Sequence, residues 1–209
     1  MFNPLKAELD KMKIILATSS KQRHEILRRA GVSFDVQTPD FEENLDRTKY
    51  SFQEYVQETA FGKVKAVEAI LAQKGENPDI IIGLDTMVSC GDKFYGKPKD
   101  TKDAIDTIRY LTNSNIPNIV LTGVCIKYKD NYEKFVESTK VYMRKLTEEE
   151  ILGYVETGEP MGHAGSYAIQ NIAASFVERI DGDYNNVIGL PLCAITLKLR
   201  ELVRKYEQN

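Results

Sequence analysis

The sequence predicts an α/β fold built on a mixed sheet, with strands and helices alternating along 209 residues. Short apolar runs at 13–18 and 80–84 are typical of buried strands. A segment with apolar residues at helical intervals follows the first run, and a longer one precedes the second. Two β-branched runs, 116–127 and 132–143, are joined by Lys129-Asp130-Asn131, which indicates a hairpin. The hairpin makes a purely parallel sheet incompatible with the sequence.

The first half of the chain is expected to contain two strand–helix units. Ser19 and Ser20 are N-cap residues for the first helix, which Gly31 ends. The spacing of Ser51-Phe-Gln-Glu54 predicts a capping box, and the long amphipathic helix that follows extends to about Lys74. Thr147-Glu-Glu-Glu150 has the same spacing and predicts a second capping box.

The other elements are identified by the same patterns of apolar spacing, caps and turns. They are expected as strands at 32–36 and 174–180, an extension of the strand at 80–84 through 87–90, a turn at Gly91-Asp92, helices at 100–111, 147–158 and 192–206, and loops at 158–165 and 182–191.

Composition favours one globular domain at 13–209 after an N-terminal extension at 1–12, since 42% of the residues are hydrophobic. No apolar run approaches the roughly 20 residues that a membrane span needs, and no secretory signal is evident. A net charge of -3 argues against a nucleic acid polymer as partner. We therefore expect a cytoplasmic protein.

Three cysteines, Cys90, Cys125 and Cys193, lie far apart in the sequence. Their odd number and the lack of any CxxC argue against a disulfide framework and favour a reducing compartment. With two histidines, a structural zinc site is not expected either.

The segment Thr18-Ser-Ser-Lys-Gln-Arg23 joins the first strand to the first helix. Free backbone N–H groups and the helix dipole favour an anion there. Arg23 in the first turn would add a bidentate contact to a phosphate. The same residues also fit an ordinary N-cap with a solvated arginine, so the pattern alone leaves both interpretations open.

The segment Gly91-Asp-Lys-Phe-Tyr-Gly96-Lys97 has the glycine and lysine spacing of a phosphate loop. That motif needs Ser or Thr after the lysine, and Pro98 stands there instead, so we exclude it. Lys97 remains a candidate phosphate ligand. The alternative is an exposed lysine on a hairpin turn.

Asp85 is the first charged residue after the apolar run at 80–84. A buried carboxylate without a partner is costly, so this position indicates a cation, a metal or a catalytic role. The alternative is a turn cap formed with Thr86. Glu42 and Glu43 are an acidic pair of the kind that is usually solvated.

Two further features have weak patterns. Lys63 on the long helix is, by its local sequence, typical of a solvated helix face. The glycine-rich segment 158–170 resembles a binding loop. His163 within it is accompanied by no nucleophile elbow, so no catalytic triad is expected.

Taken together and in order, these segments resemble the Maf family of nucleotide pyrophosphatases, from about Lys13 to the terminal helix. The matching blocks are Leu16-Ala-Thr-Ser-Ser20, Arg23-His-Glu-Ile-Leu27, Glu43, Lys63, Gly83-Leu-Asp85-Thr86, Gly96-Lys97-Pro98, Leu121-Thr-Gly-Val124, Gly158-Glu-Pro160, Ala164-Gly-Ser-Tyr-Ala-Ile-Gln170 and Gly182-Asp-Tyr-Asn-Asn-Val-Ile-Gly-Leu-Pro191.

The resemblance implies an elongated two-lobed mixed sheet with flanking helices and a central cleft, similar to inosine triphosphate pyrophosphatase. It implies hydrolysis of a nucleoside triphosphate to a monophosphate and pyrophosphate, with a divalent metal, usually Mg²⁺ or Mn²⁺. The implied catalytic residues are Asp85, Lys63, Lys97 and Glu43, the substrate-binding residues are Ser20, Gln22, Arg23, Thr86 and Gln170, and the metal ligands are Glu43 and Asp85.

Asp85-Thr86 with Gln170 resembles the branch of the family that acts on dTTP and UTP. Two positions depart from the family pattern: Gln22 stands where the family usually has arginine, and Gly162-His163 where it has Asp-Lys. A non-hydrolysing nucleotide-binding regulator linked to growth or division arrest is therefore the alternative function. A homodimer is a further expectation.

Overall fold

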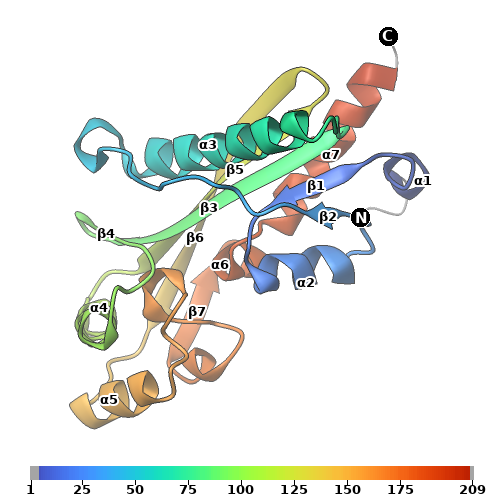
Figure 1. Ribbon diagram of the computed structural model, residues 1–209. Coiled ribbons are helices and arrows are strands. Elements are labelled where there is room, and N and C mark those ends of the chain that lie inside the picture. The colour runs from blue at the N-terminus through green and yellow to red at the C-terminus, as the bar shows by residue number, and fades with distance from the viewer. Residues whose placement is uncertain (1–4, 208–209) are drawn as a thin grey trace. The chain divides into compact units, whose positions relative to one another are not determined.

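A computed structural model describes residues 5–207 of the chain (Figure 1). Its sheet has seven strands in the order β2-β1-β3-β5-β6-β7, and β4 pairs with β3 outside this path. The strands are β1 (Ile14–Ala17), β2 (Asp35–Val36), β3 (Ile80–Cys90), β4 (Lys93–Tyr95), β5 (Asn118–Tyr128), β6 (Asn131–Met143) and β7 (Val177–Asp181).

The sheet is mixed, as the sequence predicted. β1 runs parallel to β2 and β3, whereas β4 is antiparallel to β3 and β7 is antiparallel to β6. The predicted hairpin joins β5 to β6, and Lys129 at its tip adopts a left-handed conformation with φ of 52°. The helices flanking the sheet are α1 (Lys6–Leu9), α2 (Lys21–Arg29), α3 (Phe52–Gln73), α4 (Thr101–Asn113), α5 (Glu148–Glu156), α6 (Tyr184–Ile188) and α7 (Leu192–Glu207).

The chain divides into two compact units, and each is described by itself below. Unit 1 contains the chain up to Asp85, Thr122–Glu137, and the chain from Gly189 onward, whereas unit 2 contains Thr86–Leu121 and Ser138–Ile188. The proposed boundary between an extension at 1–12 and one domain at 13–209 stays a prediction. No helix within residues 5–207 has the length and apolar character that a membrane span requires.

The helix caps form where the sequence predicted them. Ser51 and Glu54 make a reciprocal capping box at the start of α3, and Thr147 and Glu150 make another at the start of α5. In each box the side chains satisfy backbone N–H groups that the first helical turn leaves without partners.

The predicted amphipathic helix α3 lies along the strands of unit 1 (Figure 1). It packs on them through its apolar stripe. This core consists of Ala60, Val64, Val67 and Leu71 from α3 together with Ile15, Ala17, Ile81 and Cys125 from the strands. Unit 2 has its own core, in which side chains of α4 and α5 pack with residues of β3, β5, β6 and the segment that leads into β7.

Two glycines permit the close approach of α3 to the sheet. A Cβ atom added at Gly83 would lie 2.6 Å from Val64 Cγ2 and 2.8 Å from Ala60 O. One added at Gly123 would lie 2.1 Å from Val56 O. Any larger residue would therefore push the helix away from the strands.

We predict that Gly123→Ala destabilises the protein by roughly 2–3 kcal/mol, because the contact is with backbone atoms that cannot rotate away. Gly153→Ala is the matched control, since a Cβ atom at this helical position meets nothing within 4 Å. It should instead stabilise α5 by about 0.5–1 kcal/mol. Denaturant unfolding measures both effects, and equal stability of the two variants would contradict the close approach.

Several expected elements differ in the structure. Residues Ile172–Ser175 form a 3₁₀ helix, η4, so the last strand begins at Val177 and not at 174. The expected loop at 182–191 contains α6. The short elements α1 and β4 were not expected, and only Asp35–Val36 of the strand at 32–36 pairs. Each of these elements is too short for a periodic pattern to appear in the sequence.

The three cysteines are free thiols, as predicted. Cys90 and Cys125 are buried, and burial raises the pKa of Cys125 to about 12. Cys193 is exposed on α7.

Candidate active site

Asp85 lies within the continuous strand β3, as the last residue of that strand assigned to unit 1, and its side chain is buried. β3 continues beyond Asp85 to Cys90 because residues 88–90 pair with β4. The interpretation of Asp85 as a turn cap with Thr86 is therefore wrong. Asp85 is only 5% exposed, so its carboxylate needs a cationic or hydrogen-bonding partner.

Lys63 provides that partner and also binds a second carboxylate. Its Nζ lies 2.8 Å from Asp85 Oδ1 and 2.7 Å from Glu43 Oε1. The expectation that Lys63 is solvated is wrong, since the residue is 8% exposed. Position 63 follows Ala60 by three residues and precedes Val67 by four, which places it on the apolar stripe of α3.

Asp85 Oδ2 is also buried, and it accepts no hydrogen bond from any residue in the described part of the chain. A buried carboxylate oxygen without a donor costs free energy. Sites of this kind are retained where a ligand or water completes the bonding. One oxygen of Asp85 thus binds Lys63 while the other remains available for a ligand.

The carboxylates of Glu43 and Asp85 are suitable as the ligands that a protein supplies to a divalent metal ion. Glu43 is on a loop with its side chain 53% exposed, and the buried Asp85 shares the ammonium of Lys63 with it. No group of three or more metal-binding side chains occurs within residues 5–207. Mg²⁺ commonly uses one or two carboxylates and takes its other ligands from water and phosphates. Two carboxylates are therefore enough for the part of such a site that the protein supplies.

Ser20 is the N-cap of α2, as the sequence suggested. Its side chain accepts a hydrogen bond from the Arg23 backbone N–H and lies 3.1 Å from Gln22 Oε1, to which its hydroxyl donates. The backbone N–H of Ser20 donates to Thr18 Oγ1 at 3.2 Å. The N-cap interpretation is confirmed, and anion binding at the same turn stays a prediction.

Arg23 is buried and braces the backbone beside Asp85. Its Nη1 donates to Leu84 O at 3.0 Å and to Thr18 Oγ1 at 3.2 Å, and its Nε donates to Gly189 O at 2.8 Å. Burial lowers the pKa of Arg23, while the charges of Asp85 and Glu43 oppose that shift. Arg23 is thus no solvated arginine. The sequence did not indicate its partners Thr18 and Gly189, although both belong to the blocks of the family resemblance.

The other expected site residues belong to unit 2. Thr86 is half-buried on β3, Lys97 is exposed, and Gln170 is half-buried after the buried residues 165–169. The Gly165 N–H donates to Gly96 O at 3.0 Å, which ties the segment around Lys97 to the glycine-rich loop. The loop expected at 158–165 is present, with the 3₁₀ turn η3 (Ala164–Ser166) at its end.

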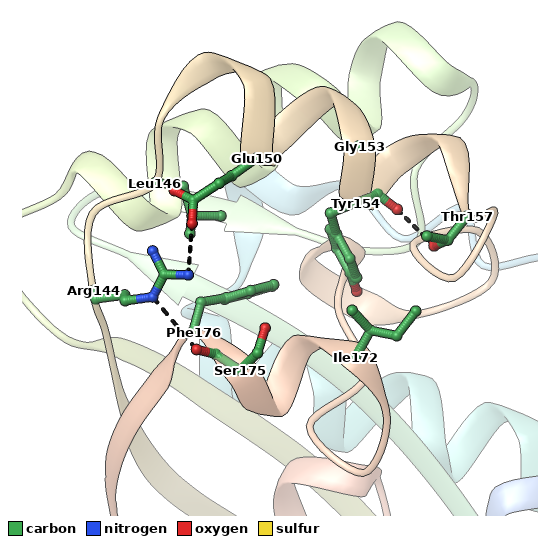
Figure 2. Close-up of a pocket in the computed structure, with 9 residues that line it drawn as sticks. All are labelled: Arg144, Leu146, Glu150, Gly153, Tyr154, Thr157, Ile172, Ser175 and Phe176. Carbon is green, nitrogen blue, oxygen red and sulfur yellow. Dashed lines mark hydrogen bonds and ion pairs between the residues drawn. The ribbon is translucent and has the colours of Figure 1, made fainter.

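Unit 2 also contains a pocket of about 200 Å³ between α5 and η4 (Figure 2). Its rim carries an ion pair between Arg144 and Glu150 at 2.8 Å. Tyr154 and Phe176 lie deeper, and their rings pack edge to face with 5.0 Å between the ring centroids. None of the expected site residues lines this pocket.

Comparison with known proteins relates this geometry to a family. The family model described as Maf-like protein matches residues 13–202. The chain belongs to the Maf family. Three of its relatives bear the name dTTP/UTP pyrophosphatase.

These Maf relatives resemble the chain over nearly their full length. The Geobacillus sp. (strain WCH70) protein is 41% identical over 90% of this chain and 97% of its own. The protein of Clostridium botulinum (strain Alaska E43 / Type E3) is 40% identical over 92% of this chain and 100% of its own. That of Bacillus pumilus (strain SAFR-032) is 41% identical over 90% of this chain and 95% of its own.

Among solved structures, the Ham1 protein of Staphylococcus aureus aligns with 63% of this chain and 71% of its own, with a TM-score of 0.43 and 16% identity.

The positions at which this Maf chain departs from the expected pattern are located in both units. Gln22 in unit 1 is half-buried and bonded to the N-cap Ser20. Gly162 in unit 2 is exposed with φ of 87°, a conformation that disfavours a side chain. His163 directs Nδ1 to Glu159 O at 2.9 Å. The histidine is thus engaged with the loop itself.

Proposed function

We propose that this chain hydrolyses nucleoside triphosphates, dTTP and UTP in particular, to the nucleoside monophosphate and pyrophosphate, in a nucleotide house-cleaning role. One observation carries the proposal: Lys63 joins the buried Asp85 to Glu43, in a chain about 40% identical to proteins named dTTP/UTP pyrophosphatases. An enzyme that cleaves a phosphoanhydride needs cations and a base in fixed positions, and this cluster would supply both.

Asp85 is the proposed general base. Its Oδ1 is held by Lys63, so Oδ2 is the atom that would take a proton from water. The water oxygen attacks the α phosphorus, the bond between that phosphorus and the α–β bridging oxygen breaks, and pyrophosphate leaves with the bonding electrons. The β-strand backbone and the brace from Arg23 keep the carboxylate in place.

The cationic residues are proposed to neutralise the triphosphate. Lys63 and Lys97 would bind phosphate oxygens, and Arg23 would add its charge from its buried position beside Leu84. Ser20 and the N–H groups at the start of α2 would hold one phosphate group. The transition state spreads negative charge over phosphate oxygens, so each positioned cation stabilises it more than the ground state.

A divalent cation, Mg²⁺ or Mn²⁺, is the proposed cofactor, held by Glu43 and Asp85. When bound, it would neutralise phosphate charge and make pyrophosphate a better leaving group. Lys63 holds both carboxylates on one side, which orients their remaining oxygens toward incoming ligands.

Thr86, Gln170 and Gln22 are the proposed determinants of substrate choice. The Gln170 amide can both donate to and accept from the edge of a pyrimidine.

We further propose a cytoplasmic location and a homodimer, with a nucleotide rather than a nucleic acid polymer as the partner. The alternative of a non-hydrolysing binder derives from Gln22 and Gly162, which each lack a charge the family pattern has. The names of the relatives favour hydrolysis.

The test is a screen for pyrophosphate release. Purified protein with Mg²⁺ or Mn²⁺ should release pyrophosphate from dTTP and UTP faster than from CTP, GTP and 7-methyl-GTP. Omitting the metal and adding a chelator should abolish release. Tight nucleotide binding with no release under either metal would instead identify a non-hydrolysing binder.

A further inference from the structure

The loop that carries Gln170 is closed by the side chain of Glu159. Glu159 Oε2 accepts a hydrogen bond from the Ile172 N–H at 2.9 Å, and Oε1 accepts one from the Ala173 N–H at 3.0 Å. The hydroxyl of Tyr154 on α5 also donates to Oε1, at 3.0 Å. One carboxylate thus joins the start of the loop to its end and to a helix.

We propose that Glu159 is a positioning residue that fixes Gln170 for recognition of the nucleotide base. This inference rests on the proposed function, in which Gln170 binds a pyrimidine edge. Gln170 stands two residues before Ile172, whose N–H Glu159 holds. On its other side Ala168 and Ile169 are buried, and the Asn171 N–H donates to Ala168 O at 3.0 Å. The backbone of Gln170 is therefore held from both directions.

The backbone of Glu159 is hydrogen-bonded to the end of α5. Its backbone N–H donates to Thr157 Oγ1 at 3.2 Å, and that hydroxyl donates to Tyr154 O at 2.6 Å. Burial and the neighbouring Glu159 raise the pKa of Tyr154, so its hydroxyl remains a donor. Figure 2 shows Tyr154 on α5 lying opposite Ile172, on the far side of the pocket from Arg144.

Glutamate suits this position better than glutamine. Three donors converge on the two oxygens of the carboxylate, and each oxygen accepts at least one of them. In Glu159→Gln one oxygen becomes an NH₂ group that donates and cannot accept. At least one backbone N–H would then face another donor, and the loop would lose its closure at Ile172 or Ala173.

The experiment compares Glu159→Gln with the wild type in steady-state hydrolysis of dTTP and CTP. We expect kcat/KM for dTTP to fall about tenfold or more through KM, with kcat changed by less than about threefold. The dTTP-to-CTP ratio of kcat/KM should fall as well. Glu156→Gln, which removes an exposed carboxylate three residues away at the end of α5, is the matched control and should change neither value.

A double variant tests whether Glu159 acts through Gln170. If it does, Glu159→Gln combined with Gln170→Ala should lose no more activity on dTTP than Gln170→Ala alone. Additive losses, or an unchanged dTTP-to-CTP ratio in Glu159→Gln, would overturn the inference while leaving the proposed hydrolysis intact. Failure of the wild type to hydrolyse dTTP or UTP would instead reject the proposed function.

A milder variant covers the case in which Glu159→Gln does not fold. Tyr154→Phe removes one hydrogen bond to the carboxylate and keeps the ring that packs on Phe176. We expect this variant to show a cooperative thermal unfolding transition, as a folded protein does. Its dTTP-to-CTP ratio of kcat/KM should be about two- to fivefold lower than that of the wild type. A folded Tyr154→Phe with the wild-type ratio would also overturn the inference.

Discussion

Asp85→Asn should reduce kcat for dTTP and UTP by about 10²–10⁴-fold while nucleotide affinity is kept. The amide has nearly the same shape as the carboxylate, so Lys63 still has its bond to Glu43 and the strand is undisturbed. The amide cannot take a proton from water, which removes the proposed base. Single-turnover kinetics, with nucleotide binding measured by calorimetry, separates the chemical step from binding.

The control for Asp85→Asn is Asp130→Asn. Asp130 is exposed at the tip of the β5–β6 hairpin and undergoes the same chemical change. Its variant should retain wild-type kcat. A fully active Asp85→Asn would show that Asp85 is not the base, and equal losses in the two variants would point to a general effect of lost carboxylate charge.

Lys63→Met should destabilise the folded protein by about 3–5 kcal/mol and abolish hydrolysis. Methionine fills a similar volume on the apolar stripe of α3, so lost packing contributes little. The cost arises because Asp85, 5% exposed, would keep its charge without a partner. Urea unfolding gives the free energy of unfolding, and the pyrophosphate assay gives the activity.

Two further variants identify the origin of that cost. Lys65→Met, also on α3, removes an exposed ion pair with Glu68 and should cost less than about 1 kcal/mol. Lys63→Met combined with Asp85→Asn should recover part of the lost stability, since no buried charge is then left alone. If the double variant is as unstable as the sum of the single losses, the pairing is not what stabilises this region.

The parts of the fold that the sequence predicted are those with local causes. The capping boxes at Ser51 and Thr147 involve side chains three residues apart, so their sequences alone specify them. The apolar residues of α3 recur at helical intervals from Val56 to Leu71, which makes the period evident. By contrast, η4 and α6 depend on contacts from distant segments, such as the Glu159 carboxylate that binds the N–H groups at the start of η4.

In the candidate site, too, the sequence predicted local features but not the contacts between distant segments. The family resemblance pointed to Asp85, Glu43 and Lys63, but their pairing depends on tertiary structure. Lys63 reaches Asp85 because Gly83 and Gly123 let α3 lie close to the sheet, and no local pattern states that distance. For Arg23, sequence suggested contact with phosphate, whereas the fold shows its guanidinium bonded to main-chain carbonyls.

The ionic cluster of unit 1 also bears on how a polyanion would be attracted to it. Two carboxylates, Glu43 and Asp85, stand with the ammonium of Lys63 and the guanidinium of Arg23, so their formal charges cancel. A cluster with no net charge attracts a distant anion only weakly. The ions of a physiological buffer largely screen the remaining electrostatic interaction at distances beyond about 8 Å. These four groups are therefore suited to selecting a nucleotide by direct contact and not by long-range attraction. The nucleotide would reach them with part of its negative charge already neutralised in solution.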